Sequence, residues 1–425
     1  MWSLLRRNRD YRRLFLAQLV SFAGDWFATV ALVGLVIDRT GSDIAATLVW
    51  VAAMLPAFVV TPLAGPMADR YDRRRIMVVC SLLQVGAAAL FFLASSNWIG
   101  FGFMAQGLIA GLSAFFGPAS GAALPNLVDP EDLPVALAAT GMIWGAMLAV
   151  GSALGAVVAS RFGRNTAFAV DAVSFAVAGV LIASIRRNTR HAESSVVGVR
   201  MRPIRDTIEG LRYTRSNPVV SSLLLAKAGG GLGTGVVGLL AVLAKRAFDA
   251  GDGGVGLLLM ARGLGVLCGP VFMRRAVQVG LHAVLTTCGV GVLVYGLGYL
   301  ALPLVPVLGV ALVVVFLAHL GGGTQWACVG YGIQVSAPDN VRGRLVATDF
   351  ALLTLTSSIS LVTGGVASSL WGPRVAIAIL GAVETTVGIV YLWQTRALRH
   401  RVRDEHMAAS SHAAERVVEL STGSM

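Results

Sequence analysis

The chain has 425 residues, of which 56% are hydrophobic and only 13% are charged, and its formal net charge is +12. Soluble proteins carry about 25% charged residues, so the composition excludes a single water-soluble core. The positive charge is spread over short loops and chain ends without a separate basic domain, which argues against nucleic-acid binding. The composition instead indicates an all-α integral membrane protein.

Apolar runs long enough to cross a bilayer recur along the whole chain. The first follows a basic N-terminus and is too long for the apolar part of a signal peptide, so we expect it to be retained. Twelve spans are predicted, near residues 13–37, 43–66, 75–96, 99–123, 134–160, 165–185, 219–244, 254–273, 281–302, 306–333, 345–370 and 374–394.

Two polar segments lie outside these spans. Residues 186–218 connect spans 6 and 7, and a loose amphipathic stripe predicts an interfacial helix there, formed by Ile204, Ile208, Leu211 and Tyr213. Residues 396–425 are basic and then small and polar, so we predict a disordered tail.

Lysine and arginine are divided unequally between the two sides of the predicted spans. The side with both termini and residues 186–218 holds 26 of them, and the opposite loops hold 6. Cytoplasmic loops of membrane proteins carry such an excess. We therefore expect a multi-pass protein of the cell's plasma (inner) membrane, with both termini in the cytoplasm.

Two stretches of the first half recur in the second half. "GPMADR" at 65–70 aligns with "GPVFMR" at 269–274, and "DPEDLPVALAAT" at 129–140 aligns loosely with "APDNVRGRLVAT" at 337–348. Both pairs occupy the same place in the order of spans. The sequence therefore predicts two pseudo-symmetric bundles of six helices, residues 1–185 and 219–395.

The loop after span 2 concentrates charge at the water interface. A carboxylate next to a helix N-terminus can pair with the helix dipole and with arginines. In the second copy Met273 replaces the acid, so we expect an asymmetric cytoplasmic gate in which the first half dominates; a topology signal alone is the alternative. The gate residues are Gly65, Asp69, Arg70, Arg73 and Arg74.

Ionisable residues within spans are costly and are therefore candidate functional groups. Asp25, Lys227, Arg262 and His319 lie inside spans, and Trp26 and Gln325 offer stacking and hydrogen bonds to a substrate. We expect Asp25 to pair with Lys227 or Arg262 across the two halves. Either this pair is structural, or Asp25 carries a proton.

The loop pattern G-x-x-x-D-R-x-x-R-R, in a chain of two six-span halves, resembles that of the major facilitator superfamily. The chain is most similar to bacterial exporters that include the enterobactin and macrolide efflux proteins. The matching stretches are "RNRDYRRLFLAQLVSFAGDW", "FFGPASGAALPNLV", "IEGLRYTRSNP" and "RGRLVATD". The resemblance implies a monomeric, cofactor-free exporter of small amphiphiles such as drugs, siderophores or metabolites, working by alternating access and driven by protons.

In the resembled fold, spans 1, 4, 7 and 10 line the central site, spans 2, 5, 8 and 11 flank it, and spans 3, 6, 9 and 12 lie outside. That ranks Asp25, Lys227, Arg262 and His319 above Asp171 and Glu384.

The sequence departs from the family's antiporters at two places. Span 4 contains no arginine, and the span 5 motif is reduced to "GSALGA", which keeps Gly151 and Gly155. The coupling ion therefore stays open, as does an importer or uniporter.

An intramembrane enzyme and a non-transporting receptor are the alternatives from other classes. An enzyme is disfavoured because Asp25 and Asp171 lie in spans that we expect not to face each other. No HExxH metal motif is present either, and no metal or cofactor is predicted.

Overall fold

The computed structural model describes residues 1–187 and 212–408. In this part, twelve helical segments are long and apolar enough to span a membrane, which confirms the predicted all-α membrane architecture. The elements are α1 (Trp2–Arg7), α2 (Arg9–Thr40), α3 (Asp43–Arg70), α4 (Arg73–Ser96), α5 (Gly100–Leu127), α6 (Leu133–Phe162), α7 (Arg164–Ala183), α9 (Pro218–Gly233), α10 (Gly235–Arg246), α11 (Gly251–Cys268), α12 (Pro270–Val279), α13 (Leu281–Ala301), the 3-10 turn η1 (Leu302–Leu304), α14 (Leu308–Ser336), α15 (Asp339–Trp371) and α16 (Pro373–Gln394).

Local sequence signals set where many of these helices begin. Asn8, Ser42 and Asp72 precede α2, α3 and α4, and each side chain accepts a hydrogen bond from a backbone N–H of the first turn. Such N-caps satisfy backbone donors that have no partner within the helix. The helix starts therefore lie within a few residues of the predicted ones.

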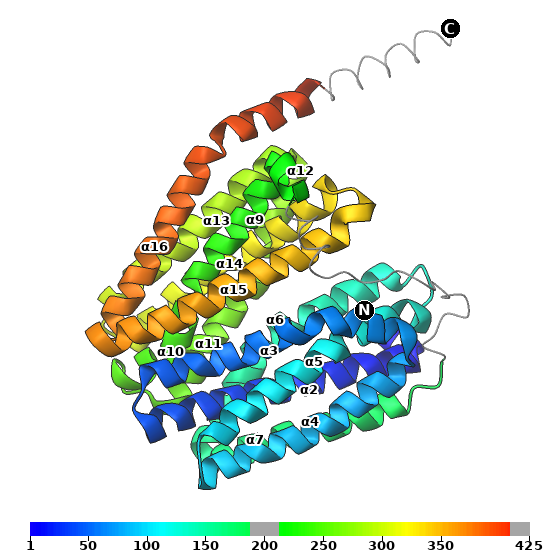
Figure 1. Ribbon diagram of the computed structural model, residues 1–425, viewed down its shortest axis with the longest axis vertical. Helices are drawn as coiled ribbons and strands as arrows, with labels where there is room; N and C mark the ends of the chain where they lie inside the picture. Colours follow the sequence, from blue (N-terminus) through cyan, green and yellow to red (C-terminus); the bar gives the residue numbers. More distant parts are fainter. Residues whose placement is uncertain (188–211, 409–425) are drawn as a thin grey trace.

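The two halves lie side by side and pack through two seams, α6 against α11 and α3 against α15. These are spans 5 and 8, and spans 2 and 11. Each span of the first half corresponds to the span numbered six higher in the second half, so span 5 corresponds to span 11 and span 2 to span 8. The two seams are therefore equivalent, as a duplicated unit requires. Figure 1 shows the two bundles meeting where α3, α10 and α11 lie and spreading towards the end that carries the N-terminus.

Two glycines repeat the same backbone geometry in both halves. Gly163 joins spans 5 and 6 with φ 87° and ψ 157°, and Gly372 joins spans 11 and 12 with φ 84° and ψ 160°. Only glycine adopts such positive φ values without strain. The repeat that two short sequence matches indicated is thus also present in the connections.

Spans 7 and 8 are interrupted, which the sequence analysis did not predict. Span 7 breaks at Thr234, where the Gly235 N–H donates to Ser360 Oγ over 2.9 Å and Ser360 Oγ donates to the Leu232 carbonyl. Span 8 breaks at Gly269, whose carbonyl accepts from Thr324 Oγ1 over 3.0 Å. Hydroxyl groups of neighbouring spans thereby satisfy the freed backbone, as a membrane interior demands.

The structure describes part of each of the two polar segments outside the predicted spans. Residues 396–408 are helical, so the predicted disorder is wrong for that part of the tail, because the helical pattern continues beyond span 12. Most of the predicted interfacial helix, with Ile204, Ile208 and Leu211, lies outside the described residues, as does the tail beyond residue 408.

Candidate functional site

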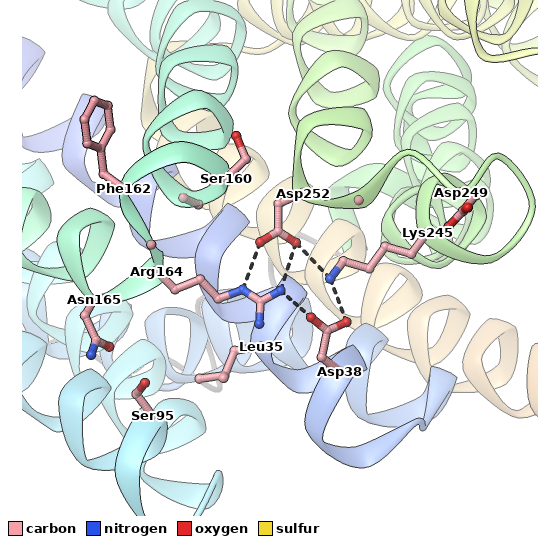
Figure 2. A pocket seen from close by; sticks show the side chains of 13 residues that line it. Leu35, Asp38, Ser95, Ser160, Phe162, Arg164, Asn165, Lys245, Asp249 and Asp252 are labelled. Carbon is pink, nitrogen blue, oxygen red and sulfur yellow. Dashed lines mark hydrogen bonds and ion pairs between the residues drawn. The ribbon is translucent and has the colours of Figure 1, made fainter.

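A ring of four charged side chains joins the halves at the end opposite the N-terminus. Asp38 ends span 1 and Arg164 begins span 6, whereas Lys245 ends span 7 and Asp252 begins span 8. Asp252 accepts from Arg164 Nε over 2.9 Å and lies 2.8 Å from Lys245 Nζ. Asp38 lies 2.8 Å from the same Nζ and also pairs with Arg164, so acids and bases alternate (Figure 2).

A second ion pair reinforces this end. Asp43, 2% exposed, lies 2.8 Å from Arg246 Nη1 and accepts from Ser368 Oγ over 2.6 Å. Arg246 also donates to the Gly41 carbonyl. We call these seven side chains the clamp: Asp38, Asp43, Arg164, Lys245, Arg246, Asp252 and Ser368.

The clamp was not predicted from the sequence. Arg164, Lys245 and Arg246 are half of the six basic residues in the loops on that side, and acids lie beside them in the sequence. The available signal was an acid next to a base at the ends of consecutive spans. Its meaning depends on which loops meet in space.

The predicted gate residues lie at the N-terminal end. Helix α3 extends to Arg70, so Gly65 and Asp69 lie in its last turns, and their side chains are outside the described part. Arg73 donates to the Ala122 carbonyl over 2.8 Å, and Arg74 donates to the Ala183 carbonyl. These two arginines bind spans 4 and 6 of their own half. Arg70 lies exposed.

Asp25 and Asp171 lie close together, which corrects the expectation that spans 1 and 6 do not face each other. Helices α2 and α7 pack along their length, and a Cβ on Gly24 would come within 2.9 Å of Asp171 Oδ1. Asp171 is fully buried, and its oxygens have no hydrogen-bond partner among the described residues. The charges of the two carboxyls interact. Glycine at position 24 lets the helices approach.

Lys227 pairs within its own half, so the predicted pair with Asp25 does not form. Its Nζ lies 3.1 Å from Asp349 Oδ2 on span 11 and 3.6 Å from the centre of the Trp326 ring. Gln325 donates to the Ala226 carbonyl over 2.6 Å, which ties spans 7 and 10 together. Both predicted site residues therefore have partners within the second half.

Arg262 and His319 lie at neighbouring places on spans 8 and 10. His319 is buried and lies 3.1 Å from the Tyr299 hydroxyl. Arg262 Nε and Nη1 are buried without a hydrogen-bond partner, and the guanidinium faces the Trp50 ring of the other half at 5.7 Å. The predicted pair of Arg262 with Asp25 is thus also absent.

Trp26 belongs to an indole cluster on the first half. Its ring centre lies 6.1 Å from that of Trp50 and 6.4 Å from that of Trp144. Trp26, Trp50 and Trp144 come from spans 1, 2 and 5, and the cluster lies close to Arg262 of the second half. A stacking surface and a cation therefore meet at the boundary between the halves.

The two span 5 glycines allow close packing within the first half. A Cβ on Gly155 would lie 2.7 Å from Phe27 Cα, and one on Gly151 would lie 3.2 Å from Trp26 Cβ. Both positions press α6 onto α2. The remnants of the motif thus set the spacing of spans 1 and 5.

Glu384 on span 12 is fully buried, although the sequence analysis placed it outside the centre. A Cβ on Gly233 of span 7 would lie 2.8 Å from its Oε2 and 2.7 Å from the Tyr295 ring. Asp171 and Glu384 thus occupy equivalent places, each on the sixth span of a half and against a glycine of the first span.

Comparison with known proteins gives the same architecture. The family model described as transmembrane secretion effector matches residues 1–423. The multidrug efflux pump Tap of Mycobacterium tuberculosis is 27% identical over 410 residues, which is 90% of this chain and 94% of Tap. Macrolide efflux protein A of Streptococcus pyogenes is 25% identical over 218 residues, covering 50% of this chain and 53% of its own.

A solved structure shares the fold at low identity. The crystal structure of the peptide transporter POT in complex with sulfate matches with a TM-score of 0.73 and 12% identity, over 93% of this chain and 96% of that chain. The proteins that match this chain are transporters, so the intramembrane enzyme is excluded. The chain is a multi-pass membrane transporter that belongs to the transmembrane secretion effector family of the major facilitator superfamily.

Proposed function

We propose that this transporter is a secondary active exporter of small amphiphilic molecules such as drugs, siderophores or other metabolites. It works by alternating access as a monomer in the plasma membrane, and protons drive it. The efflux relatives Tap and macrolide efflux protein A support export over import.

The observation that carries this proposal is the difference between the two ends. Hydrogen bonds and ion pairs between described residues of different halves all lie at the clamp. The excess of lysine and arginine at the N-terminal end supports a cytoplasmic position for that end. The clamp is then the closed external gate of a carrier that is open towards the cytoplasm.

The proposed internal gate is the loop around Asp69, Arg70, Arg73 and Arg74. In the alternative arrangement, with the clamp apart, this end would close over the substrate. The arginines that now bind their own half lie at the place where such a closure must form.

The proposed proton site is the pair Asp25 and Asp171. Asp25 lies on α2 at membrane depth, next to the glycine that contacts Asp171 of α7, and neither carboxyl forms an ion pair with a described basic side chain. Two ionised carboxylates on these neighbouring helices would repel each other in a medium that screens charge poorly. One proton held between them removes that repulsion, and its release couples export to the gradient.

Transport by the purified protein in liposomes tests this proposal. Vesicles with an acidic interior should accumulate radiolabelled erythromycin or tetracycline, because protons leaving the lumen drive the drug inwards through inverted molecules. Asp25→Asn and Asp171→Asn should each lower this gradient-driven uptake at least tenfold, and a factor of ten corresponds to a free-energy difference of about 1.4 kcal/mol. Empty liposomes and vesicles treated with an uncoupler are the controls.

Three results would contradict parts of the proposal. Uptake that is indifferent to the gradient would make the protein a uniporter. Uptake driven by protons moving with the drug would make it an importer. Full gradient dependence in both asparagine variants would remove the proton role from this pair.

A further inference from the structure

The sequence singled out three basic side chains inside the spans of the second half, and two of them have partners. Lys227 is paired with Asp349, and His319 is bonded to the Tyr299 hydroxyl. Arg262 differs, because its Nε and Nη1 are buried with no acceptor in the described part of the chain. Two buried guanidinium N–H groups without an acceptor are unfavourable, so this position favours a ligand that brings one.

A second donor beside Arg262 is in the same condition. Trp50 is 8% exposed, and its indole Nε1 also has no acceptor within the described residues. Its ring faces the guanidinium at 5.7 Å. Two neighbouring donors from opposite halves therefore lack the same thing, an oxygen that accepts hydrogen bonds.

The carboxylates that the structure describes at this depth have other neighbours than Arg262. Asp25 and Asp171 lie together at the α2–α7 contact, and Asp349 is paired with Lys227. Glu384 lies against Gly233 and Tyr295. None of these acids makes an ion pair with Arg262.

The surroundings of the two donors are aromatic. Trp26 lies beside Trp50 and leads to Trp144, which is 42% exposed. Flat apolar surfaces of this kind bind the ring or hydrocarbon body of a ligand, while a few polar groups fix its orientation.

We propose that Arg262 and Trp50 bind an anionic oxygen group of the transported molecule, and that Trp26 and Trp144 hold its aromatic or apolar body. The preferred substrates are thus amphiphiles with a carboxylate or a similar anion, and the substrate itself supplies the charge that Arg262 lacks. Because the contacts come from both halves, binding also links the halves at the site. This inference rests on the proposed export function and names its substrate class.

Three matched ligands test the inference on the purified full-length protein. They are 2-naphthylacetate, the uncharged alcohol 2-(2-naphthyl)ethanol and the cation 2-(2-naphthyl)ethylammonium, each titrated by calorimetry in detergent. The carboxylate should bind at least tenfold more tightly than the alcohol, and the ammonium should bind least tightly. Arg262→Gln should weaken carboxylate binding at least tenfold and change alcohol binding less than threefold.

Two further variants separate the contributions. Trp50→Phe keeps an aromatic ring but removes the N–H, and should weaken carboxylate binding about tenfold to 100-fold, the range of one hydrogen bond to a charged acceptor. Arg161→Gln removes the same charge from an exposed position and should change nothing. If Arg262→Gln does not fold, Arg262→Lys, which keeps the charge but loses the planar fork, should weaken carboxylate binding by less.

The inference is overturned if the wild-type protein binds the three ligands equally, prefers the ammonium or does not bind the carboxylate. It is also overturned if Arg262→Gln keeps the preference. A protein that moves erythromycin in liposomes but shows no preference for the carboxylate would refute this inference and leave the proposed export function intact.

Discussion

The two ends of the molecule use the same residue types in opposite ways. At the clamp, arginine and lysine of one half or the other bind acids of both halves, as in the ring of Asp38, Arg164, Lys245 and Asp252 (Figure 2). At the N-terminal end, Arg73 binds the carbonyl of Ala122 within its own half.

Further contacts at the N-terminal end follow the same rule. Arg7 pairs with Asp132 of the first half, and the Tyr213 hydroxyl donates to the Ser336 carbonyl of the second half over 3.4 Å. Between these described residues, the clamp contacts therefore join the halves, whereas the contacts at the N-terminal end each lie within one half. The difference teaches that the position of a charged residue relative to the seam, and not its type, decides whether it joins the two halves or stabilises one of them.

The largest expected effect comes from breaking the clamp with Asp252→Asn. This change weakens hydrogen bonds from both Arg164 and Lys245 to a carboxylate that is 9% exposed. Only the bond from Arg164 joins the two halves, and a charged bond of this kind contributes about 1.5–3 kcal/mol, so the population with separated halves should rise about 10- to 100-fold. Spin labels on residues 40 and 249, in a background without the native cysteines, should report longer distances.

The matched control for this experiment is Arg39→Gln. Arg39 lies at the same end but donates to the Ser95 carbonyl of its own half. Its loss should leave the distance distribution unchanged. A clamp that stays closed in Asp252→Asn would show that the apolar seams alone hold this end.

A smaller effect is expected from Gly263→Ala in the seam between the ends. The new Cβ would lie 2.5 Å from the backbone N of Ala149 on α6, and backbone cannot yield as a side chain can. Overpacking of this kind costs about 1–3 kcal/mol. We expect a lower melting temperature in detergent and a wider label distance at the clamp.

Gly253→Ala on the same helix is its control, because a Cβ there meets nothing within 4 Å. If both alanine variants melt alike, the close approach of α11 and α6 does not contribute to joining the halves.

The smallest effect is expected from Arg73→Gln at the N-terminal end. It removes hydrogen bonds to the carbonyls of Ala68 and Ala122, and because Arg73 is partly exposed, water replaces part of them and the loss for the first half is about 1 kcal/mol. The melting temperature should fall slightly, while the label distance at the clamp stays the same. Arg75→Gln, at an exposed position of the same helix start, should change neither quantity. A change in the clamp distance would show that both ends lock the halves in this conformation.

The sequence placed the spans well and the partners of their charged residues poorly. Asp25, Lys227 and Arg262 were recognised because a charge at membrane depth stands out in any hydrophobic run. Their partners were wrong: Lys227 binds Asp349 on span 11, and Asp25 faces Asp171 on span 6. One step along a helix turns a side chain by about 100°, so an error of one residue in register changes the neighbour that it faces.

The clamp residues also show that local sequence does not indicate a partner that lies far away along the chain. Asp38 and Lys245 are 207 residues apart, and nothing in either local sequence indicates the other. Their contact exists because two helix ends from different halves meet at one end of the seam.

By itself the sequence determined the twelve membrane spans, the excess of positive charge on one side and the division into two related halves. These properties are additive along the chain, since hydropathy and charge are summed over local windows. Only the tertiary structure decided the breaks in spans 7 and 8, the joining of the halves at one end and the isolation of Arg262 beside Trp50. Each of these depends on the rotation and spacing of helices that lie far apart in sequence, and packing across the whole molecule fixes both.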